Sequence, residues 1–260
     1  MNILERIIQQ KLIEVALAKT KITIEQLKEL PLFNRTCLNL KESVLDPNKN
    51  GIISEYKRAS PSKGIINNHS QVSEVAKAYE ENNVSAISVL TDHAFFKGSL
   101  DDLSIARKTV NIPILRKEFI IDPFQITEAK AYGADIILLI AACLSSEEIK
   151  TFSTYAKEIG LNVLLEVHNE DELKNNKFDT IDAIGVNNRN LTDFSVSIQH
   201  SLDLVNKIPD QFIKVSESGI SDPDTIRLLK NVGFQAFLIG ENFMKTKNPA
   251  ESIHEFVQHI

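Results

Sequence analysis

Acidic and basic side chains follow one another closely in the segment around residue 55. Glu55 and Lys57 come directly after two isoleucines and would project from one face of a strand, because strand side chains alternate with period two. A loop containing Ser60, Lys63 and Gly64 follows. A carboxylate and an ammonium at the end of a strand can transfer protons and hold an anionic substrate. An exposed edge strand with a solvated charge pair would show the same pattern. This segment alone therefore does not distinguish a functional site from an ordinary strand.

Eight short apolar segments alternate with segments of helical periodicity. The predicted strands are residues 52–57, 86–91, 114–117, 136–141, 162–166, 183–187, 212–217 and 236–240. Most are apolar runs without clean alternation, as is typical of strands buried on both faces of a parallel sheet. Residues 145–148 and 221–223 carry the capping residues of helix starts. Eight such units predict an α/β fold, a closed (β/α)8 TIM barrel, whose usual length is about 250 residues.

A doubly wound open sheet is the alternative fold. It would be expected to carry a glycine-rich dinucleotide turn, and the sequence contains no Gly-x-Gly-x-x-Gly. The barrel is therefore the preferred interpretation. No Pro/Gly/Ser-rich linker divides the chain, so residues 1–260 are interpreted as one barrel domain.

The first 48 residues precede the eight units and are expected to form an N-terminal helical extension. An apolar stripe at spacings of three and four predicts a helix that packs on another part of the protein, and its members are Ile3, Leu4, Ile7, Ile8, Leu12 and Val15. A plain cap that closes the bottom of the barrel is one role that this helix could have.

Polar and ionisable residues stand at the ends of most predicted strands. In a barrel of this kind the carboxyl ends of the strands meet at the face that carries the active site. The residues concerned are Glu55, Lys57, Lys117, Glu166, Asn187, Arg189 and Glu217. Their convergence on one mouth predicts a site for acid–base chemistry.

Two glycines follow the seventh and eighth predicted strands. Gly219 lies in Ser-Glu-Ser-Gly-Ile and Gly240 in Leu-Ile-Gly-Glu. Loops at these two places often hold phosphate in barrels, because glycine lets backbone N–H groups approach the oxygens closely. Either glycine could be a simple turn residue, but the two together favour a phosphate site, to which Ser60 and Lys57 could contribute.

Composition excludes several other classes of function. The formal net charge is −6, which disfavours a nucleic-acid surface. The longest apolar run, residues 136–144, is far shorter than the roughly 18 residues of a membrane span. Cys37 and Cys143 form no metal or redox motif, which fits a reducing cytoplasm. Cys143 adjoins a predicted strand and is interpreted as a small hydrophobe. The histidines show no ligand spacing, and His168, which could touch the site because it closely follows Glu166, is interpreted as structural.

Six motifs together resemble the indole-3-glycerol-phosphate synthase family of the tryptophan pathway. They are Glu-Tyr-Lys-Arg-Ala-Ser-Pro-Ser at 55–62, Leu-Arg-Lys-Glu-Phe-Ile at 115–120, Leu-Glu-Val-His at 165–168, Gly-Val-Asn-Asn-Arg-Asn-Leu at 185–191, Ser-Glu-Ser-Gly-Ile at 216–220 and Leu-Ile-Gly-Glu at 238–241. The resemblance runs through all eight predicted strands and includes the N-terminal extension. It implies that this extension covers the catalytic mouth as a lid, together with the loop of residues 58–68, and does not cap the bottom of the barrel. One departure is visible, because Glu118 stands where the family usually has aspartate.

The resemblance implies a reaction and a set of roles. The family closes the indole ring of 1-(2-carboxyphenylamino)-1-deoxyribulose 5-phosphate with loss of CO₂ and water. The implied catalytic residues are Lys117 as the acid, Lys57 for the substrate carboxylate, Glu166 as the essential carboxylate, and Glu55, Glu217 and Asn187 as orienting groups. The implied substrate and phosphate ligands are Ser60, Arg189, Ser218, Gly219, Gly240 and Glu241. An apolar slot for the aryl ring could come from Phe96, Phe119, Leu138 and Leu191, each of which could equally be core packing.

This chemistry involves no redox change, so neither a cofactor nor a metal is expected. The expected partner is a small phosphorylated substrate, with no nucleic acid, no membrane and no obligate protein partner, in the cytoplasm. Two other functions stay open at this point. One is another phosphate-binding barrel enzyme such as phosphoribosylanthranilate isomerase, although neither cysteine stands where that reaction would need a base. The other is a non-catalytic sugar-phosphate-binding barrel subunit. Such a protein could lose Lys117 or Glu166 and keep the phosphate loops, whereas this chain has both residues.

Overall fold

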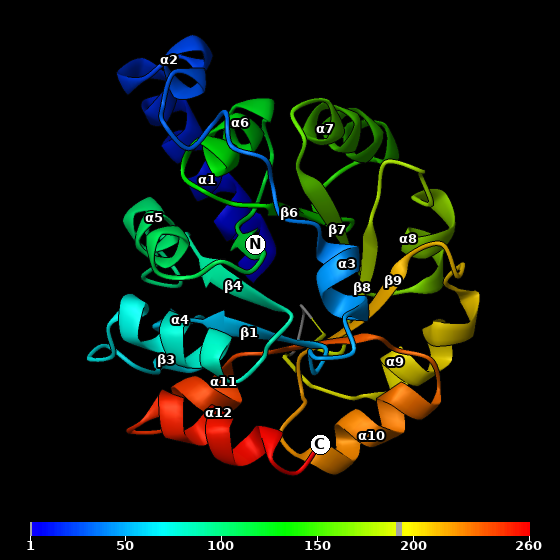
Figure 1. The fold of residues 1–260 in the computed structure, drawn as a ribbon. Helices are drawn as coiled ribbons and strands as arrows, with labels where there is room; N and C mark the ends of the chain where they lie inside the picture. Colours follow the sequence, from blue (N-terminus) through cyan, green and yellow to red (C-terminus); the bar gives the residue numbers. More distant parts are fainter. Residues whose placement is uncertain (1, 191–193) are drawn as a thin grey trace.

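A closed barrel of parallel strands forms the centre of the protein, and helices surround it (Figure 1). The structure is a computed structural model and describes residues 2–190 and 194–260. In these ranges, eight strands close the barrel in the order β1-β10-β9-β8-β7-β6-β5-β4, and β2 and β3 form a separate small hairpin. The strands are β1 (Ile52–Tyr56), β2 (Ala59–Ser60), β3 (Gly64–Ile65), β4 (Ala86–Leu90), β5 (Ile114–Lys117), β6 (Ile136–Ile140), β7 (Asn162–Val167), β8 (Ala183–Asn187), β9 (Ile213–Glu217) and β10 (Ala236–Ile239).

Helices connect the barrel strands along the chain and form the outer layer. They are α1 (Ile3–Lys21), α2 (Ile24–Lys28), α3 (Leu40–Leu45), α4 (Val72–Glu81), α5 (Leu100–Thr109), α6 (Pro123–Ala131), α7 (Ser146–Glu158), α8 (Glu170–Asn175), α9 (Gln199–Leu204), the 3-10 turn η1 (Val205–Lys207), α10 (Pro223–Asn231), α11 (Glu241–Met244) and α12 (Pro249–Val257). The predicted TIM barrel is confirmed, and every predicted strand overlaps a barrel strand, with ends that differ by one residue at most. Of these helices, none is long and apolar enough to cross a membrane.

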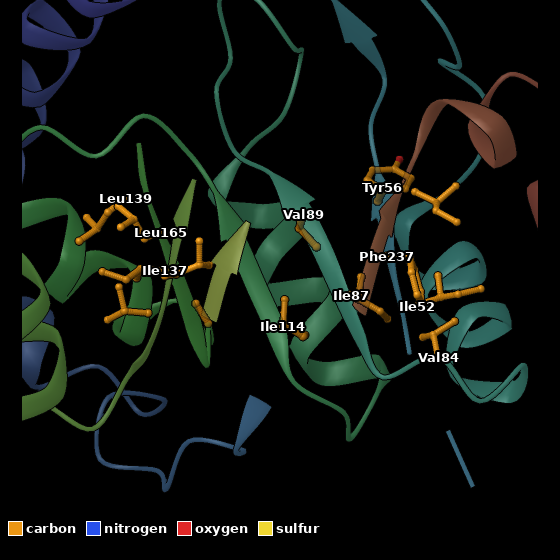
Figure 2. Close-up of a cluster of buried hydrophobic side chains, with 14 of the residues drawn as sticks. Ile52, Tyr56, Val84, Ile87, Val89, Ile114, Ile137, Leu139, Leu165 and Phe237 are labelled. Atoms are coloured by element: carbon orange, nitrogen blue, oxygen red, sulfur yellow. The ribbon is translucent and has the colours of Figure 1, made fainter. Parts of the chain in front are cut away.

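Two apolar layers hold the barrel together. Side chains that point outward from the strands, such as Ile87, Ile114 and Leu139, pack under the helices (Figure 2). Side chains that point inward, such as Leu115 and Leu164, fill the interior. Because both faces of the sheet are buried, the strands carry nearly continuous apolar runs, which is the pattern seen in the sequence.

The predicted helix starts are capped by the expected residues. The Ser145 side chain accepts a hydrogen bond from the backbone N–H of Glu148 at the start of α7. The Asp222 side chain accepts one from the N–H of Thr225, and Pro223 occupies the first turn of α10. Each cap satisfies a backbone donor that has no partner within its own helix, so these boundaries could be predicted from local sequence.

The N-terminal extension divides between the two ends of the barrel. Leu40 and Val44 of α3 join the interior cluster at the starts of the strands, and the Ser43 hydroxyl donates to the carbonyl of Ser85 just before β4. Helix α3 lies across the barrel in Figure 1, whereas α1 and α2 lie beside α6. Ile3 and Ile7 of α1 reach the opposite end, where they line the cavity described below. Of the two positions considered from the sequence, α1 thus lies beside the cavity, and a different helix, α3, lies at the other end of the barrel.

The buried face of α1 differs from the predicted apolar stripe. Its buried residues are Ile7, Lys11 and Val15, which are spaced four residues apart. Leu12, a member of the predicted stripe, is 52% exposed. That part of the prediction was wrong, because a lysine rather than a leucine occupies the middle of the packed face.

Candidate active site

A cavity of about 620 Å³ opens at the carboxyl ends of the barrel strands. Fifteen of the sixteen residues predicted for the site line it: Glu55, Lys57, Ser60, Phe96, Lys117, Phe119, Leu138, Glu166, Asn187, Arg189, Glu217, Ser218, Gly219, Gly240 and Glu241. The remaining one, Leu191, lies outside the described residues. Parallel strands bring their carboxyl ends to one face, so side chains far apart in the sequence meet in one space.

Lys117, the last residue of β5, lies between two carboxylates. Its Nζ is 3.0 Å from Oε2 of Glu166 and 2.6 Å from Oε2 of Glu217. Burial would lower the pKa of Lys117, but the attraction of Glu166 and Glu217 outweighs it and raises this pKa above its usual value. Lys117 is therefore a charged ammonium that can donate a proton into the cavity.

The two carboxylates next to Lys117 have opposite pKa shifts. Burial and the negative charge of Glu166 raise the pKa of Glu217 above its usual acidic range. For Glu166, burial acts in the same direction, but Lys117, His168 and the Asn187 amide outweigh it, so its pKa falls below the usual value. Neighbouring groups whose pKa values are driven apart can play different acid–base roles.

Two further side chains, Asn187 and His168, lie against Glu166. The Asn187 amide Nδ2 donates to Oε1 of Glu166 at 3.1 Å. His168 lies on the same side, with its Nε2 3.5 Å from that oxygen and its Nδ1 3.4 Å from Oε2 of Glu172. Burial would lower the pKa of His168, but Glu172 and Glu166 raise it above the usual value. A residue interpreted from the sequence as structural thus contacts the candidate catalytic carboxylate.

Glu55 and Lys57 form a second charged pair at the end of β1. Nζ of Lys57 is 2.7 Å from Oε1 of Glu55, and the Ser88 hydroxyl on β4 is 3.4 Å from the other oxygen of Glu55. Both residues line the cavity, as the alternation of the strand predicted.

Two glycines make room for these carboxylates. A Cβ added at Gly240 would lie 2.6 Å from Oε1 of Glu55. A Cβ added at Gly185 would lie 2.0 Å from Oε1 of Glu217. Both distances are far below van der Waals contact, so the positions of Glu55 and Glu217 depend on these two residues having no side chain.

The loops after β9 and β10 form one end of the cavity. Ser218 and Gly219 follow β9, and both have positive φ angles, 70° and 77°. Gly240 follows β10 and caps the short helix α11. Nearby cations come from Arg189, whose guanidinium is 3.7 Å from Glu241, and from Lys63, 3.9 Å from the same carboxylate.

Apolar side chains line another part of the cavity. Phe96 and Phe119 lie with their ring centroids 6.1 Å apart, and Leu138 lines the same cavity. Sequence reasoning did not assign Leu90, Ile140, Phe194 or Val196 to this lining, nor Lys63 to its polar part. It also did not assign Ser88 and His168 as contacts of Glu55 and Glu166. Signals for Ser88 and Lys63 were present, because Ser88 interrupts an apolar strand and Lys63 lies in the first anion-binding loop.

Comparisons with known proteins agree on one family. A family model described as Indole-3-glycerol phosphate synthase matches residues 4–256. The indole-3-glycerol phosphate synthase of Bacteroides thetaiotaomicron is 45% identical over 261 aligned positions, which cover 100% of this chain and 99% of that protein. The corresponding protein of Acetivibrio thermocellus is 42% identical over 257 positions, or 98% of each chain. Among solved structures, 3-hexulose-6-phosphate synthase from Salmonella typhimurium is similar with a TM-score of 0.63 at 14% identity, covering 80% of this chain and 97% of that one, which shows a shared fold.

Proposed function

Because the chain belongs to the indole-3-glycerol phosphate synthase family, we propose that its cavity closes the indole ring with Lys117 as proton donor and Glu166 as proton acceptor. The enzyme is a carboxy-lyase of tryptophan biosynthesis that acts on a small phosphorylated substrate. It converts 1-(2-carboxyphenylamino)-1-deoxyribulose 5-phosphate into indole-3-glycerol phosphate, with loss of CO₂ and water. The observation that carries the division of roles is the ammonium of Lys117 held between Glu166 and Glu217.

The first step needs an acid at the substrate ketone. An aromatic carbon attacks this carbonyl, and negative charge develops on its oxygen as the ring closes. Lys117 is suited to be this acid because it is charged, lines the cavity and can donate a proton to that oxygen. The carboxylates of Glu166 and Glu217 fix the ammonium before the substrate arrives, so little reorganisation is needed during the reaction.

Lys57 is the proposed partner of the substrate carboxylate that leaves as CO₂. It projects from the end of β1 into the cavity, and Glu55 holds its ammonium at 2.7 Å. A cation at this position binds the carboxylate in the ground state and can also protonate a leaving hydroxyl. Glu55 is proposed to orient Lys57, with Gly240 leaving the space that Glu55 needs.

The last step removes a proton and a hydroxyl to make the ring aromatic. Glu166 suits the role of base because its lowered pKa keeps it ionised, while the Asn187 amide holds one of its oxygens. Glu217, with its raised pKa, is proposed to adjust the charge on Lys117 and to orient substrate hydroxyls. Acid and base are then distinct groups that act in different steps.

The loops after β9 and β10 are the proposed phosphate site. Ser218, Gly219, Gly240 and Glu241 border the cavity there, and Ser60 borders it from the first loop. The backbone N–H groups of these loops are the proposed phosphate ligands. Arg189 is proposed to support this end through its contact with Glu241. A phosphate bound by backbone N–H groups is the usual arrangement at these loops of a barrel.

The apolar part of the cavity is the proposed site of the aryl ring. Phe96, Phe119 and Leu138 would surround it, and Ile3 and Ile7 of α1 line the same cavity. Helix α1 is therefore proposed as a lid element that excludes water from the reacting atoms, where electrostatic interactions become stronger.

None of these steps changes an oxidation state, so we propose a reaction without cofactor or metal. We also propose that the enzyme works in the cytoplasm and without an obligate protein partner. Support for the cytoplasm comes from the two cysteines, Cys37 and Cys143, which are free thiols. The isomerase and the non-catalytic subunit considered from the sequence are set aside by the family match.

The direct test is to mix the purified protein with 1-(2-carboxyphenylamino)-1-deoxyribulose 5-phosphate and follow the indole fluorescence of the product. We expect turnover by the wild type and none by Lys117→Met. Lys117→Met should still bind substrate within about tenfold of the wild type, or about 1.4 kcal/mol, because the phosphate and aryl contacts remain. Near-wild-type turnover by this variant would remove Lys117 from the mechanism.

A further inference from the structure

Lys11 is a buried charge in the packed face of α1. It is 3% exposed and lies between Ile7 and Val15, which are also buried. Its ammonium is within 3.0 Å of both Asp92, which follows β4, and Glu118, which follows β5. A third carboxylate, Glu14 of the same helix, is 2.6 Å away. One ammonium thus joins the N-terminal helix to the ends of two neighbouring barrel strands.

Each of the two barrel carboxylates also holds the backbone of a loop. Oδ1 of Asp92 accepts hydrogen bonds from the backbone N–H groups of Phe95 and Phe96, at 2.7 and 3.2 Å. Oε1 of Glu118 accepts one from the N–H of Phe119 at 2.9 Å. The carboxylates that contact Lys11 therefore hold the backbone of Phe96 and Phe119, whose rings line the cavity.

The second oxygen of Glu118 is held as well. The Thr91 hydroxyl donates to it at 2.8 Å, and the guanidinium of Arg116 is 3.8 Å away. With both oxygens engaged, Glu118 has a defined position relative to Lys11. The glutamate that replaces the family's usual aspartate is thus an integrated part of this cluster.

These contacts meet at the apolar part of the cavity. Phe96 and Phe119 lie 6.1 Å apart by ring centroid, and both line the cavity together with Ile3 and Ile7 of α1. The three segments that build this wall, the loop after β4, the loop after β5 and α1, are the three segments that the ammonium of Lys11 joins.

A buried ion pair is a weak source of stability, because removing charges from water offsets most of their attraction. It does fix geometry, since each charge has only one favourable position relative to its partners. Burial would lower the pKa of Lys11, but Glu118 and Asp92 raise it above the usual value, so the ammonium stays charged over the working pH range. The cluster is suited to positioning more than to stabilising the fold.

We propose that Lys11 is a positioning residue for substrate recognition, which sets Phe96 and Phe119 against α1 and thereby shapes the wall that binds the aryl ring. This inference rests on the proposed assignment of that wall to the aryl ring. Lys11 itself does not touch the reacting atoms. Its removal changes how the aromatic part of the substrate is held and leaves the phosphate loops as they are.

The test compares two inhibitors in the wild type and in Lys11→Met. Anthranilate, the aromatic part of the substrate, reports on the aryl wall, and inorganic phosphate reports on the loops after β9 and β10. In Lys11→Met we expect the KM of the substrate and the inhibition constant of anthranilate to rise about tenfold or more, the size of effect that small misplacements produce. The inhibition constant of phosphate should stay unchanged.

Two further variants control the experiment. Lys19→Met removes another lysine of α1, which pairs with Asp122 at 2.5 Å outside the cavity, and should leave both inhibition constants unchanged. Asp92→Asn keeps the acceptor oxygen for Phe95 and Phe96 but loses the charge that faces Lys11. Asp92→Asn should weaken the binding of anthranilate but not that of phosphate. If Lys11→Met fails to fold, this variant replaces it in the test.

The possible failures are distinguishable. If anthranilate does not compete with substrate in the wild type, the aryl assignment is wrong, and the inference falls with it. If anthranilate competes in the wild type and equally well in Lys11→Met and Asp92→Asn, the aryl assignment stands and the positioning role is overturned. If the binding of anthranilate and the binding of phosphate were weakened equally, the positioning role would also be overturned, because that result indicates a general structural defect.

Discussion

Gly185 offers a way to move one carboxylate of the proposed active site, that of Glu217, without replacing it. Gly185 lies in β8 beside Glu217, and a Cβ at this position would lie 2.0 Å from Oε1 of Glu217. Ordinary contact begins near 3.4 Å, so the carboxylate has to move by about 1.4 Å. The φ angle of Gly185 is not among the positive ones, so alanine fits its backbone, and the main consequence of Gly185→Ala is the displacement of Glu217.

The displacement breaks a short contact. Oε2 of Glu217 is 2.6 Å from Nζ of Lys117. The two carboxylate oxygens move as one rigid group, so a shift of more than an ångström at Oε1 also displaces Oε2 and takes the pair out of hydrogen-bonding range. Lys117 would keep Glu166, 3.0 Å away, as its partner. A misplacement of this size near the reacting atoms costs about 100-fold in rate, or about 2.7 kcal/mol of transition-state stabilisation.

The assay is kcat from the fluorescence of the indole product, with urea unfolding measured in parallel. We expect Gly185→Ala to lose about 100-fold in kcat. We also expect it to lose about 1–3 kcal/mol in the free energy of unfolding, because the added methyl overfills the interior. The protein should still be folded under assay conditions, so the loss of rate is not a loss of native enzyme.

A double variant separates displacement of Glu217 from general strain. Glu217→Asp shortens the side chain by one methylene and relieves the overlap with the new methyl. The alanine substitution should therefore cost less in the Glu217→Asp background than in the wild type, which a double-mutant cycle measures. A kcat of Gly185→Ala close to wild type, or the same loss in both backgrounds, would refute the reasoning.

Three further predictions concern the phosphate site, the N-terminal helix and the pH profile. Gly240→Val should weaken the binding of the phosphorylated substrate more than the binding of a dephosphorylated analogue. An equal loss of affinity for both would place the phosphate elsewhere. Deletion of the residues before Ile22 should raise KM and lower kcat. The barrel should still unfold cooperatively, because α3 remains to close its other end. Full activity, or failure to fold, would contradict the lid role of α1. Since the pKa of Glu217 is raised, this group ionises at a higher pH than an ordinary glutamate. Once Glu217 is ionised, its negative charge stabilises the ammonium of Lys117 and makes it a weaker acid. The wild-type kcat should therefore fall as pH rises through that ionisation, and Glu217→Gln should lack the fall; an identical profile in both proteins would be inconsistent with this.

Placement of the polar site residues could be predicted from the sequence because the barrel simplifies the problem. Once the strands are recognised as parallel, Lys117, Glu166 and Glu217 must meet at one face, although a hundred residues separate the first from the last. The helix starts at Ser145 and Asp222 were predictable for a similar reason, since a cap depends on residues only three positions away.

Lys11 shows where such reasoning fails. Periodicity assigns a lysine to the solvent side of a helix and favours Leu12 for the packed side. The structure buries Lys11 and exposes Leu12, because Asp92 and Glu118 neutralise the ammonium. Asp92 and Glu118 come from distant parts of the chain, so the sequence around Lys11 does not predict them as its partners. The contact between His168 and Glu166 was missed because strand alternation gives the direction of a side chain but not its reach.

In the proposed mechanism Lys117 acts before CO₂ is lost and Glu166 acts after it. Single-turnover experiments that measure CO₂ and indole-3-glycerol phosphate from the same reaction test this most directly. We predict that Lys117→Met releases neither, because the ring never closes, and that Glu166→Gln releases CO₂ without an equal amount of indole product, because dehydration stalls. Release of CO₂ by Lys117→Met, or equal amounts of CO₂ and product from Glu166→Gln at the wild-type rate, would contradict the claim.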